Sequence, residues 1–363
     1  MNLPLYRLES EPSLALEGNR GLWYSRFFNQ YAGDDWAIPD DGKRRWVSEN
    51  AKWAGAPEAL QIHALRQRAL VNALRGRGAV FATDWHFATG LGLPHPVENG
   101  LAWHHTLGVP YLAGSGVKGL IRAWMEVWEE KKQLSEDWFG TTERAGRFLF
   151  FDAVPIEPVQ LAADVMTPHM AKWYELGGKI ADWEREPDKI PADWHAPVPV
   201  PFLVVKQAKL LFGIAPRRSE FAGELDQVFE ALQRALDWLG AGAKTAAGYG
   251  RMVEDPGAGA QLRKEAEKAA AQAAEAALLP HERDFRDLKR RFEEDSRANR
   301  LKPSGQVVGD LNKLLEQASD WPIEYRKMLA DLAEDIFGHS GIGWGNSAKK
   351  RERKAKIQAL RGS

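Results

Sequence analysis

At residues 110–124 the sequence reads Pro-Tyr-Leu-Ala-Gly-Ser-Gly-Val-Lys-Gly-Leu-Ile-Arg-Ala-Trp, an extended run that turns into a helix through a glycine-rich corner. Gly114 and Gly116 permit positive φ and close backbone approach, so the first N–H groups of the helix can point at a phosphate oxygen, which the helix dipole also favours. Lys118 and Arg122 share one helical face. The stretch predicts a polyanion site, but it is also typical of a simple helix cap in which Ser115 binds a free N–H.

Neither glycine-rich loop of the chain has the spacing of a nucleotide-binding P-loop. Lys118 is followed by Gly119 where Ser or Thr is required, and at 240–245 Ala243 stands where a glycine is required. We therefore expect neither loop to hold ATP, and no cofactor is predicted.

Composition restricts the class of protein. The chain has 363 residues, 44% of them hydrophobic, which suffices for an ordinary packed core, and no apolar run approaches the roughly 18 residues that span a bilayer. The absence of cysteine excludes disulfides and thiolate metal sites and fits a cytoplasmic protein. Because the formal net charge is only -1, any nucleic-acid surface must be local.

Three regions are predicted along the chain. Residues 1–78 form an aromatic-rich N-terminal segment with one helix, which begins at Pro57 and ends near Arg75. Residues 79–255 form the central domain, and residues 256–363 form a helical C-terminal extension.

The C-terminal extension is expected to hold several helices and to end in a basic tail. The tail at 349–361 has seven Lys or Arg residues against one Glu. Such a tail is usually a solvated, mobile end, and less often a contact with RNA or an acidic protein. The expected helices lie at about 256–279, after Pro280, at 306–318 and at 322–337.

Hydrophobic periodicity predicts an α+β order for the central domain. The strands at 202–206 and 209–215 are expected to pair as a hairpin, after a long insertion at about 157–197 that is rich in proline and aromatic residues. Strands and helices follow the βαββαβ order of a ferredoxin-like (RRM-like) domain. The other expected elements are a strand at 79–89, an extended piece at 101–112, a helix at 117–132, a strand at 146–154, a helix at 223–239 and a strand at 249–254.

A second glycine-rich stretch, Gly-Ala-Lys-Thr-Ala-Ala-Gly-Tyr-Gly-Arg at 242–251, precedes the last strand. Together with 114–122 it resembles the RAMP (repeat-associated mysterious protein) superfamily of CRISPR systems, whose ferredoxin-like or RRM-like domain carries both kinds of loop. Asp-Val-Met-Thr-Pro-His at 164–169 and Pro-Val-Pro-Val-Pro-Phe at 197–202 are similar to the family of sixth subunits of the Cmr complex, the type III-B RNA-guided effector. The resemblance covers roughly residues 79–254.

The resemblance implies a non-catalytic backbone subunit that serves antiviral defence. Such a subunit helps hold the guide RNA near its 3′ end and packs against other RAMP subunits of the Cmr complex, with target RNA as a further partner and no membrane contact. A guide of any sequence must be accepted, so we expect contacts to the RNA backbone, with Tyr249 or aromatics of the insertion stacking on bases. The predicted RNA-binding residues are Gly114, Ser115, Gly116, Lys118, Arg122, His169, Lys244, Thr245, Tyr249 and Arg251.

No catalytic or metal-binding constellation can be read from the sequence. In the family, target cleavage is attributed to an aspartate of a different subunit, and Asp84 cannot be placed in that subunit's motif. The alternative is a RAMP-type endoribonuclease that processes CRISPR RNA precursors without metal, using His169, His104 or Tyr249. A third interpretation is a protein scaffold whose glycine-rich corners are merely caps.

Overall fold

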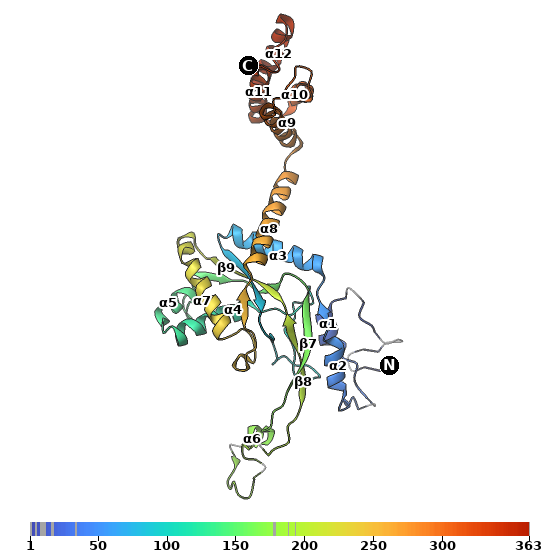
Figure 1. The fold of residues 1–363 in the computed structure, drawn as a ribbon, viewed down its shortest axis with the longest axis vertical. Coiled ribbons are helices and arrows are strands. Elements are labelled where there is room, and N and C mark those ends of the chain that lie inside the picture. Colours follow the sequence, from blue (N-terminus) through green and yellow to red (C-terminus); the bar gives the residue numbers. More distant parts are fainter. Residues whose placement is uncertain are drawn as a thin grey trace. The chain divides into compact units, whose positions relative to one another are not determined.

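The computed structural model describes residues 2–3, 6–7, 12–15, 18–32, 35–176, 179–187, 189–192 and 194–362. The remaining parts of the predicted N-terminal segment and of the predicted insertion lie outside the described residues. The chain divides into two compact units, Met1–Glu267 and Lys268–Ser363, each with a hydrophobic core of its own (Figure 1). Within the described residues, no helix combines the length and the apolar character needed to cross a lipid bilayer.

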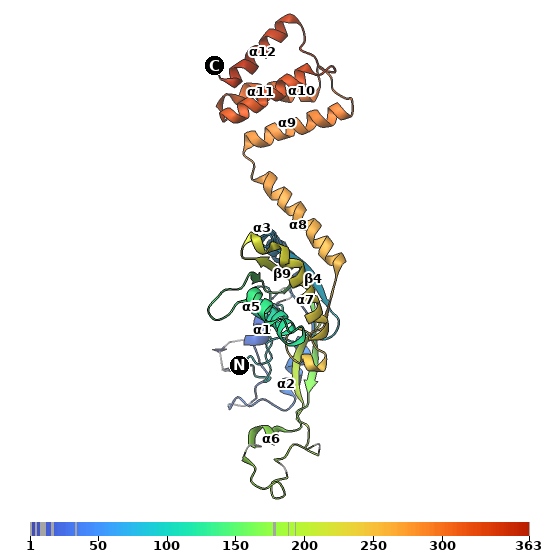
Figure 2. The same cartoon turned by 90° about the vertical axis from the view of Figure 1, so that its left-hand side faces the viewer.

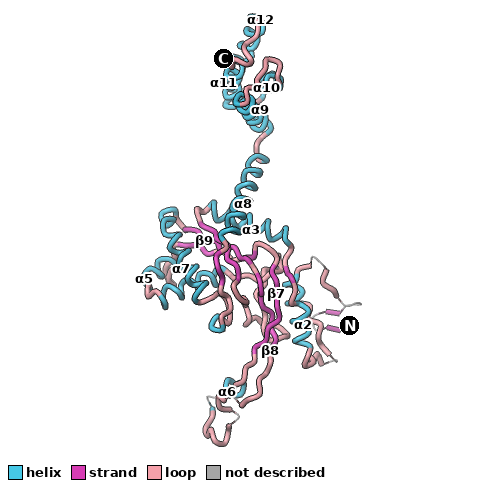
Figure 3. The backbone as a smooth tube through the Cα atoms, viewed as in Figure 1, coloured by secondary structure: helices cyan, strands magenta, loops and turns pink. Residues whose placement is uncertain are grey.

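The first unit is built on an antiparallel sheet with the strand order β10–β4–β9–β5. Figure 3 shows the strands of this unit in magenta, with β9 labelled. The short strand β6 (Val154–Pro155) also pairs with β9. Antiparallel strands combined with many helices confirm the predicted α+β class. The strands of the main order are β4 (Arg77–Thr83), β5 (Phe148–Phe150), β9 (Lys209–Pro216) and β10 (Met252–Glu254).

Successive side chains of each strand point to opposite faces of the sheet, and each face packs against its own layer of helices. Phe81 and Phe212, with ring centroids 5.2 Å apart, belong to the main core together with residues of α4 (Gly114–Ala123) and α7 (Leu225–Trp238). Val80 and Leu211 pack instead with residues of α3 (Pro57–Ala73) and of the start of α8 (Pro256–Ala276). The sheet is therefore covered on both faces, which explains why its strands read as almost continuous apolar runs.

A second antiparallel sheet contains β3 (Trp53–Ala54), β7 (Val159–Met166) and β8 (Val200–Gln207). Beyond β7 and β8 the chain continues into an arm that carries α6 (Ala171–Leu176) (Figures 1 and 2). The predicted insertion therefore begins with a strand of eight residues, and only the part beyond Met166 belongs to the arm.

The hairpin predicted between 202–206 and 209–215 is wrong. β8 pairs with β7, and β9 pairs with β4. Only Ala208 separates β8 from β9, and this is shorter than the two-residue loops of the tightest common hairpins. The chain therefore passes from one sheet directly into the other.

The N-terminal segment supplies aromatic side chains to the main core. Tyr24 and Trp46 are buried, and the ring of Tyr24 stacks on His95 at 4.4 Å. The segment holds β1 (Asn2–Leu3), β2 (Tyr6–Arg7), α1 (Arg20–Arg26) and α2 (Gly42–Asn50).

The helix expected at 117–132 begins earlier and ends in a different geometry. α4 starts at Gly114 and passes into a π-helical segment, Trp124–Trp128, before α5 (Lys132–Phe139). The extended piece predicted at 101–112 forms isolated β-bridges, such as the one between Leu112 and Ala153.

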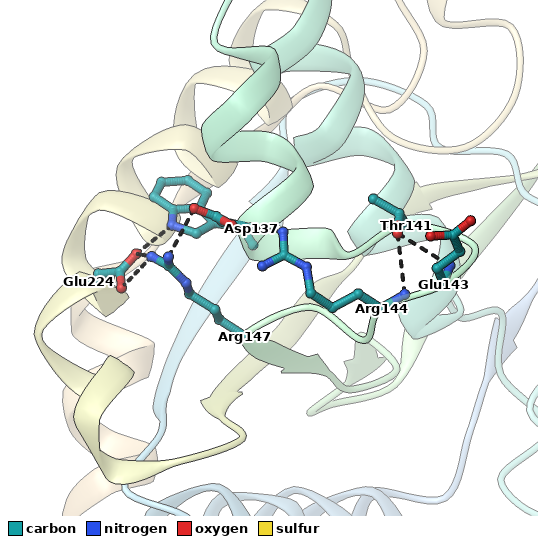
Figure 4. A network of polar contacts seen from close by, with 7 residues as sticks. Asp137, Thr141, Glu143, Arg144, Arg147 and Glu224 are labelled. Carbon is teal, nitrogen blue, oxygen red and sulfur yellow. Dashed lines mark hydrogen bonds and ion pairs between the residues drawn. The ribbon is translucent and has the colours of Figure 1, made fainter.

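Arg147, at the entrance to β5, joins two helices through a network of polar contacts (Figure 4). Its guanidinium donates to Glu224 Oε1 at 2.9 Å and to Asp137 Oδ2 at 2.9 Å. Arg144 donates to the other oxygen of Asp137 at 2.9 Å. Asp137 lies in α5 and Glu224 directly precedes α7, so the network ties both helices to the edge of the sheet and pairs both arginines with carboxylates.

The second unit is a helical bundle in which the predicted mobile tail is an ordered helix. α12 (Ser347–Arg361) places Ile357 and Leu360 in the core, at 2% and 5% exposure. The prediction of a mobile end is wrong because two apolar residues three positions apart anchor a helix even among many charges. The other helices are α9 (Pro280–Arg297), α10 (Gln306–Gln317) and α11 (Ile323–Gly338).

Candidate nucleic-acid interface

The first glycine-rich stretch, 114–122, lies at the start of α4, and its helix terminus already has a capping group. The Gly114 N–H donates to Asp152 Oδ1 at 2.7 Å, so a carboxylate occupies the place where a phosphate was expected. Ser115 is exposed and is not the cap, because Ala113 is the N-cap residue. The interpretation of Ser115 as the capping residue is therefore wrong.

Gly114 serves close packing rather than a left-handed turn. Neither Gly114 nor Gly116 has a positive φ, which corrects the expected role of these residues. A Cβ on Gly114 would lie 2.3 Å from the Phe150 carbonyl oxygen, so glycine is required for α4 to approach β5. A Cβ on Gly116 would meet only the Leu112 side chain, at 3.0 Å.

A cationic pocket of about 380 Å³ opens beside this helix start. Lys118 and Arg217 line it together with Ser115, Leu74 and the apolar residues of β5. Lys118 is half-buried and Arg217 is exposed. Arg122 does not line this pocket, and its Nε donates to Glu126 Oε1 at 2.8 Å, which neutralises much of its charge.

The second glycine-rich stretch, 242–251, uses its glycines for left-handed backbone. Gly242, Gly248 and Gly250 have φ values of 86°, 85° and 78°, and Lys244 has a φ of 59°. A Cβ on Gly250 would lie 1.9 Å from the Ala241 carbonyl oxygen. Here glycine is needed both for the conformation and for the space.

Tyr249 holds the second stretch against the β7–β8 pair. Its ring is only 9% exposed, and its hydroxyl donates to Asp164 Oδ2, which also lies 3.2 Å from His86 Nδ1. Burial, together with the hydrogen bond to Asp164, raises the pKa of Tyr249 above its ordinary value. The ring therefore acts as an anchor and presents no open face on which a base could stack.

Asp164 is the centre of this small network. Partial burial works to raise its pKa, but hydrogen bonds from the Tyr249 hydroxyl, the Val165 N–H and His86 outweigh burial and lower the pKa. The carboxylate is therefore ionised at neutral pH and fixes the loop to the strand.

The cations of the second stretch are mostly engaged. Lys244 Nζ lies 5.4 Å from the ring centroid of Phe202 and 5.9 Å from that of Tyr249. The Arg251 guanidinium donates to Asp237 Oδ1 at 2.6 Å, which raises the pKa of Arg251, and it lies 3.8 Å from Asp84 Oδ2. Thr245 is half-buried and opens a short 3-10 turn.

The structure does not bring the two stretches together. Gly114 packs against β5 and the second stretch leads into β10, and these strands are the opposite edges of the sheet. Three strand spacings separate the edges, roughly 14 Å. His169 is exposed in the arm, beyond the end of β7.

Two exposed residues near the glycine-rich stretches, Arg217 and Trp85, were not predicted from the sequence. Arg217 follows β9 directly, and only the pairing of β9 with β5 places it near Lys118. Trp85 is 57% exposed and stacks on His86 at 4.7 Å between ring centroids, so the Asp164 network holds an exposed aromatic face in place. The run Asp-Trp-His at 84–86 was read as part of the strand predicted at 79–89, but β4 ends at Thr83 and the run follows it.

A histidine pair shares a pocket with Asp152, the residue that accepts from the Gly114 N–H. The ring centroids of His63 and His104 are 5.2 Å apart, beside a pocket of about 290 Å³ that Arg66 and Asp152 also line. Burial lowers the pKa of both histidines. Among the residues that the structure describes, no group of three His, Asp or Glu side chains is arranged to hold a metal ion.

Comparison with known proteins gives a consistent set of relatives. The RAMP superfamily model matches residues 79–253. The CRISPR system Cmr subunit Cmr6 of Pyrococcus furiosus is 27% identical over 248 residues, which cover 51% of this chain and 70% of that protein.

Solved structures give weaker matches. A chain of the type III-B Cmr-beta complex bound to cognate target RNA has a TM-score of 0.44 at 19% identity, covering 66% of this chain and 87% of that one. The crystal structure of Cmr6 from Pyrococcus furiosus has a TM-score of 0.32 at 24% identity, covering 50% of this chain and 97% of that one. The family match and the sequence relative confirm the resemblance seen in the sequence: residues 79–253 match the RAMP superfamily, and the chain is similar to Cmr6 of Pyrococcus furiosus.

Proposed function

We propose that the chain is a non-catalytic RNA-binding backbone subunit of a cytoplasmic type III-B CRISPR effector complex. In this role it holds the guide RNA near its 3′ end, contacts the guide–target region and packs against other RAMP subunits. Homology to Cmr6 supports the assignment to the complex. The observation that carries RNA binding is the pocket at the start of α4, where Lys118 and Arg217 face the same open space.

We further propose that the central sheet is a ferredoxin-like (RRM-like) domain. The order β4, α4, β5, β9, α7 and β10 along the chain, together with the sheet order β10–β4–β9–β5, supports this assignment. RRM domains stack bases on an open sheet face, but here α3 and α8 cover that face. RNA must therefore run over the loops and edges of the sheet, where the two glycine-rich stretches lie.

Two kinds of contact follow from this geometry. Lys118 and Arg217 supply charge to phosphates, and Asp152, which accepts from the Gly114 N–H, limits how closely a phosphate can approach the amides of the helix start. Trp85 supplies a stacking face that tolerates any base. Both contacts are independent of sequence, as a subunit that serves many guides requires.

The test is RNA binding followed by reconstitution. Unstructured RNAs of unrelated sequence should bind the purified chain with affinities that differ by less than about threefold, and affinity should fall steeply with salt. Effector complexes assembled without the chain should leave the 3′ end of the guide open to nuclease. Sequence-selective binding, or full protection without the chain, would contradict the proposal.

The alternative, a metal-independent endoribonuclease, is favoured by one observation only. The three candidates from the sequence do not meet, because Tyr249 is buried beside Asp164 and His169 lies in the arm. His104, however, has His63 beside it at a distance suited to an acid–base pair. Incubation with CRISPR repeat RNA in EDTA tests this: cleavage at one site that is lost in His63→Ala and His104→Ala would establish the enzyme.

A further inference from the structure

The second unit, outside the part of the chain that matches the RAMP superfamily, carries a concentrated positive charge. Residues 268–348 hold twelve Lys or Arg against fourteen Asp or Glu, whereas α12 holds seven against one. The excess charge of the unit therefore lies entirely on one helix.

Three of the seven α12 cations are held by partners in the bundle. Lys356 pairs with Glu316 and Glu352, and Arg361 pairs with Asp331 and Glu334. Arg353 lies 4.1 Å from the ring centroid of Phe337 and donates to the Gly343 carbonyl oxygen. These residues attach α12 to the bundle.

The other four cations, Lys349, Lys350, Arg351 and Lys354, form what we call the α12 basic patch. All four are exposed. Within residues 194–362, which the structure describes without a gap, no carboxylate oxygen lies within 4.0 Å of their charged groups. Lys354 Nζ lies 5.7 Å from the ring centroid of Trp344, a contact that leaves its charge in place.

The positions of these cations are unfavourable for the helix itself. The patch occupies the first half of α12, where the positive end of the helix dipole disfavours cations. Lys350 and Lys354 are four residues apart, as are Lys349 and Arg353, so like charges repel along the helix. Because these charges destabilise the helix that carries them, their presence indicates that the surface binds an external ligand.

The chemistry of the patch identifies the ligand class. Protein interfaces are depleted in Lys and have apolar anchors at their centre, but none of the exposed large apolar side chains of the described residues belongs to α12. Insertion into a membrane would need the apolar side of α12, which is buried in the bundle through Ile357 and Leu360. Clustered cations without an apolar anchor are the footprint of a nucleic-acid backbone.

We propose that the α12 basic patch is a second RNA-binding site, which contacts the phosphates of single-stranded RNA independently of sequence. It lies in a different unit from Lys118 and Arg217, so it acts whether or not the first glycine-rich stretch binds RNA. Two sites on one chain raise the affinity for a long RNA above that of either site.

The experiment compares two variants of the full chain that lose the same charge. The patch variant is Lys349→Ala, Lys350→Ala, Arg351→Ala and Lys354→Ala. The control variant is Lys289→Ala, Lys302→Ala, Lys313→Ala and Lys327→Ala, four exposed lysines elsewhere in the second unit. Binding of an unstructured 40-nucleotide RNA is measured by fluorescence anisotropy between 50 and 300 mM salt.

The patch variant should lower the slope of log Kd against log salt by about 2 to 3, because each phosphate contact to single-stranded RNA contributes about 0.7. The control should retain the slope of the unmodified chain. Relief of repulsion should leave the melting temperature of the patch variant unchanged or raised, which shows that the variant is folded. An unchanged slope, or an equal fall in both variants, would overturn the proposal.

Discussion

The first and second glycine-rich stretches both combine glycine with Lys and Arg, yet their glycines meet different needs of the backbone. Gly114 has ordinary backbone angles and makes room for the Phe150 carbonyl, whereas Gly250 is left-handed and also lies against a carbonyl. Their cations differ as well, because Lys118 faces an open pocket and Arg251 is bound by Asp237. The first stretch is therefore organised for charge, and the second for holding a loop against a strand.

The largest effect should come from adding a methyl group where the backbone has no space. Gly250→Ala combines a positive φ with a Cβ 1.9 Å from the Ala241 oxygen and should lower the free energy of unfolding by roughly 2–4 kcal/mol. Gly114→Ala should lower it by about 1–3 kcal/mol through the clash with Phe150. Urea unfolding followed by circular dichroism measures both.

The matched control for these two variants is Gly116→Ala. Its added Cβ meets only a side chain that can move, and alanine is the better helix former, so stability should change by less than about 1 kcal/mol. A Gly116→Ala variant as unstable as Gly114→Ala would contradict the account of close packing in the first stretch.

Mutation should separate the contribution of base stacking to RNA binding from the contribution of charge. Trp85→Ala should weaken the binding of single-stranded RNA by about 1–3 kcal/mol without changing the salt slope, because stacking releases no counterions. The control is Trp238→Ala, a tryptophan at the end of α7 that is 67% exposed, and this variant should bind as the unmodified chain does. Loss of salt dependence in Trp85→Ala would mean that the ring acts by positioning a cation.

The Asp164 anchor should have a smaller, pH-dependent effect. Asp164→Asn should lower the free energy of unfolding by roughly 1 kcal/mol at pH 7, because hydrogen bonds to a partly exposed carboxylate are weakened. The folded-state pKa of Asp164 is below its ordinary value, so its contribution is present above that value and is lost as the pH falls through the folded-state pKa. The two proteins should therefore converge in stability toward pH 3, as measured by urea unfolding at pH 7, 5 and 3.

Tyr249→Phe tests the other partner of the hydrogen bond between Tyr249 and Asp164. It removes one hydrogen bond to Asp164 while keeping the buried ring, so it should destabilise the protein less than Asp164→Asn does. Additive losses in the double variant would show that the two residues act separately and that no anchor exists.

Local sequence patterns predicted the elements well. Periodicity placed α7 and α3 within a few residues, and it predicted the helix after Leu112, although α4 starts at Gly114 and not at Val117. The pairing of β8 with β7 was not predictable from the strands themselves, because both β8 and β9 are apolar and adjacent in sequence. It depends on a partner strand that the sequence analysis read as part of an insertion.

The site was harder to predict because a sequence shows which charges exist and not which are paired. Arg122 and Arg251 were chosen with Lys118 as phosphate ligands, but Glu126 and Asp237 bind them in the folded chain. Glu126 is four residues from Arg122 on the same helix and could have been recognised. Asp237 and Arg251 meet only through the packing of α7 beside β10, so no local pattern indicates that pair.

The salt dependence of RNA binding tests the central claim most directly. The double variant Lys118→Ala with Arg217→Ala should lower the slope of log Kd against log salt by up to about 1.4. The matched double variant Arg122→Ala with Arg251→Ala should lower this slope by less than half as much, because carboxylates already bind those arginines. Asp152→Asn, which keeps an oxygen for the Gly114 N–H and removes a negative charge, should strengthen binding. Equal slopes for the two double variants, or weaker binding by Asp152→Asn, would contradict a phosphate site at the start of α4.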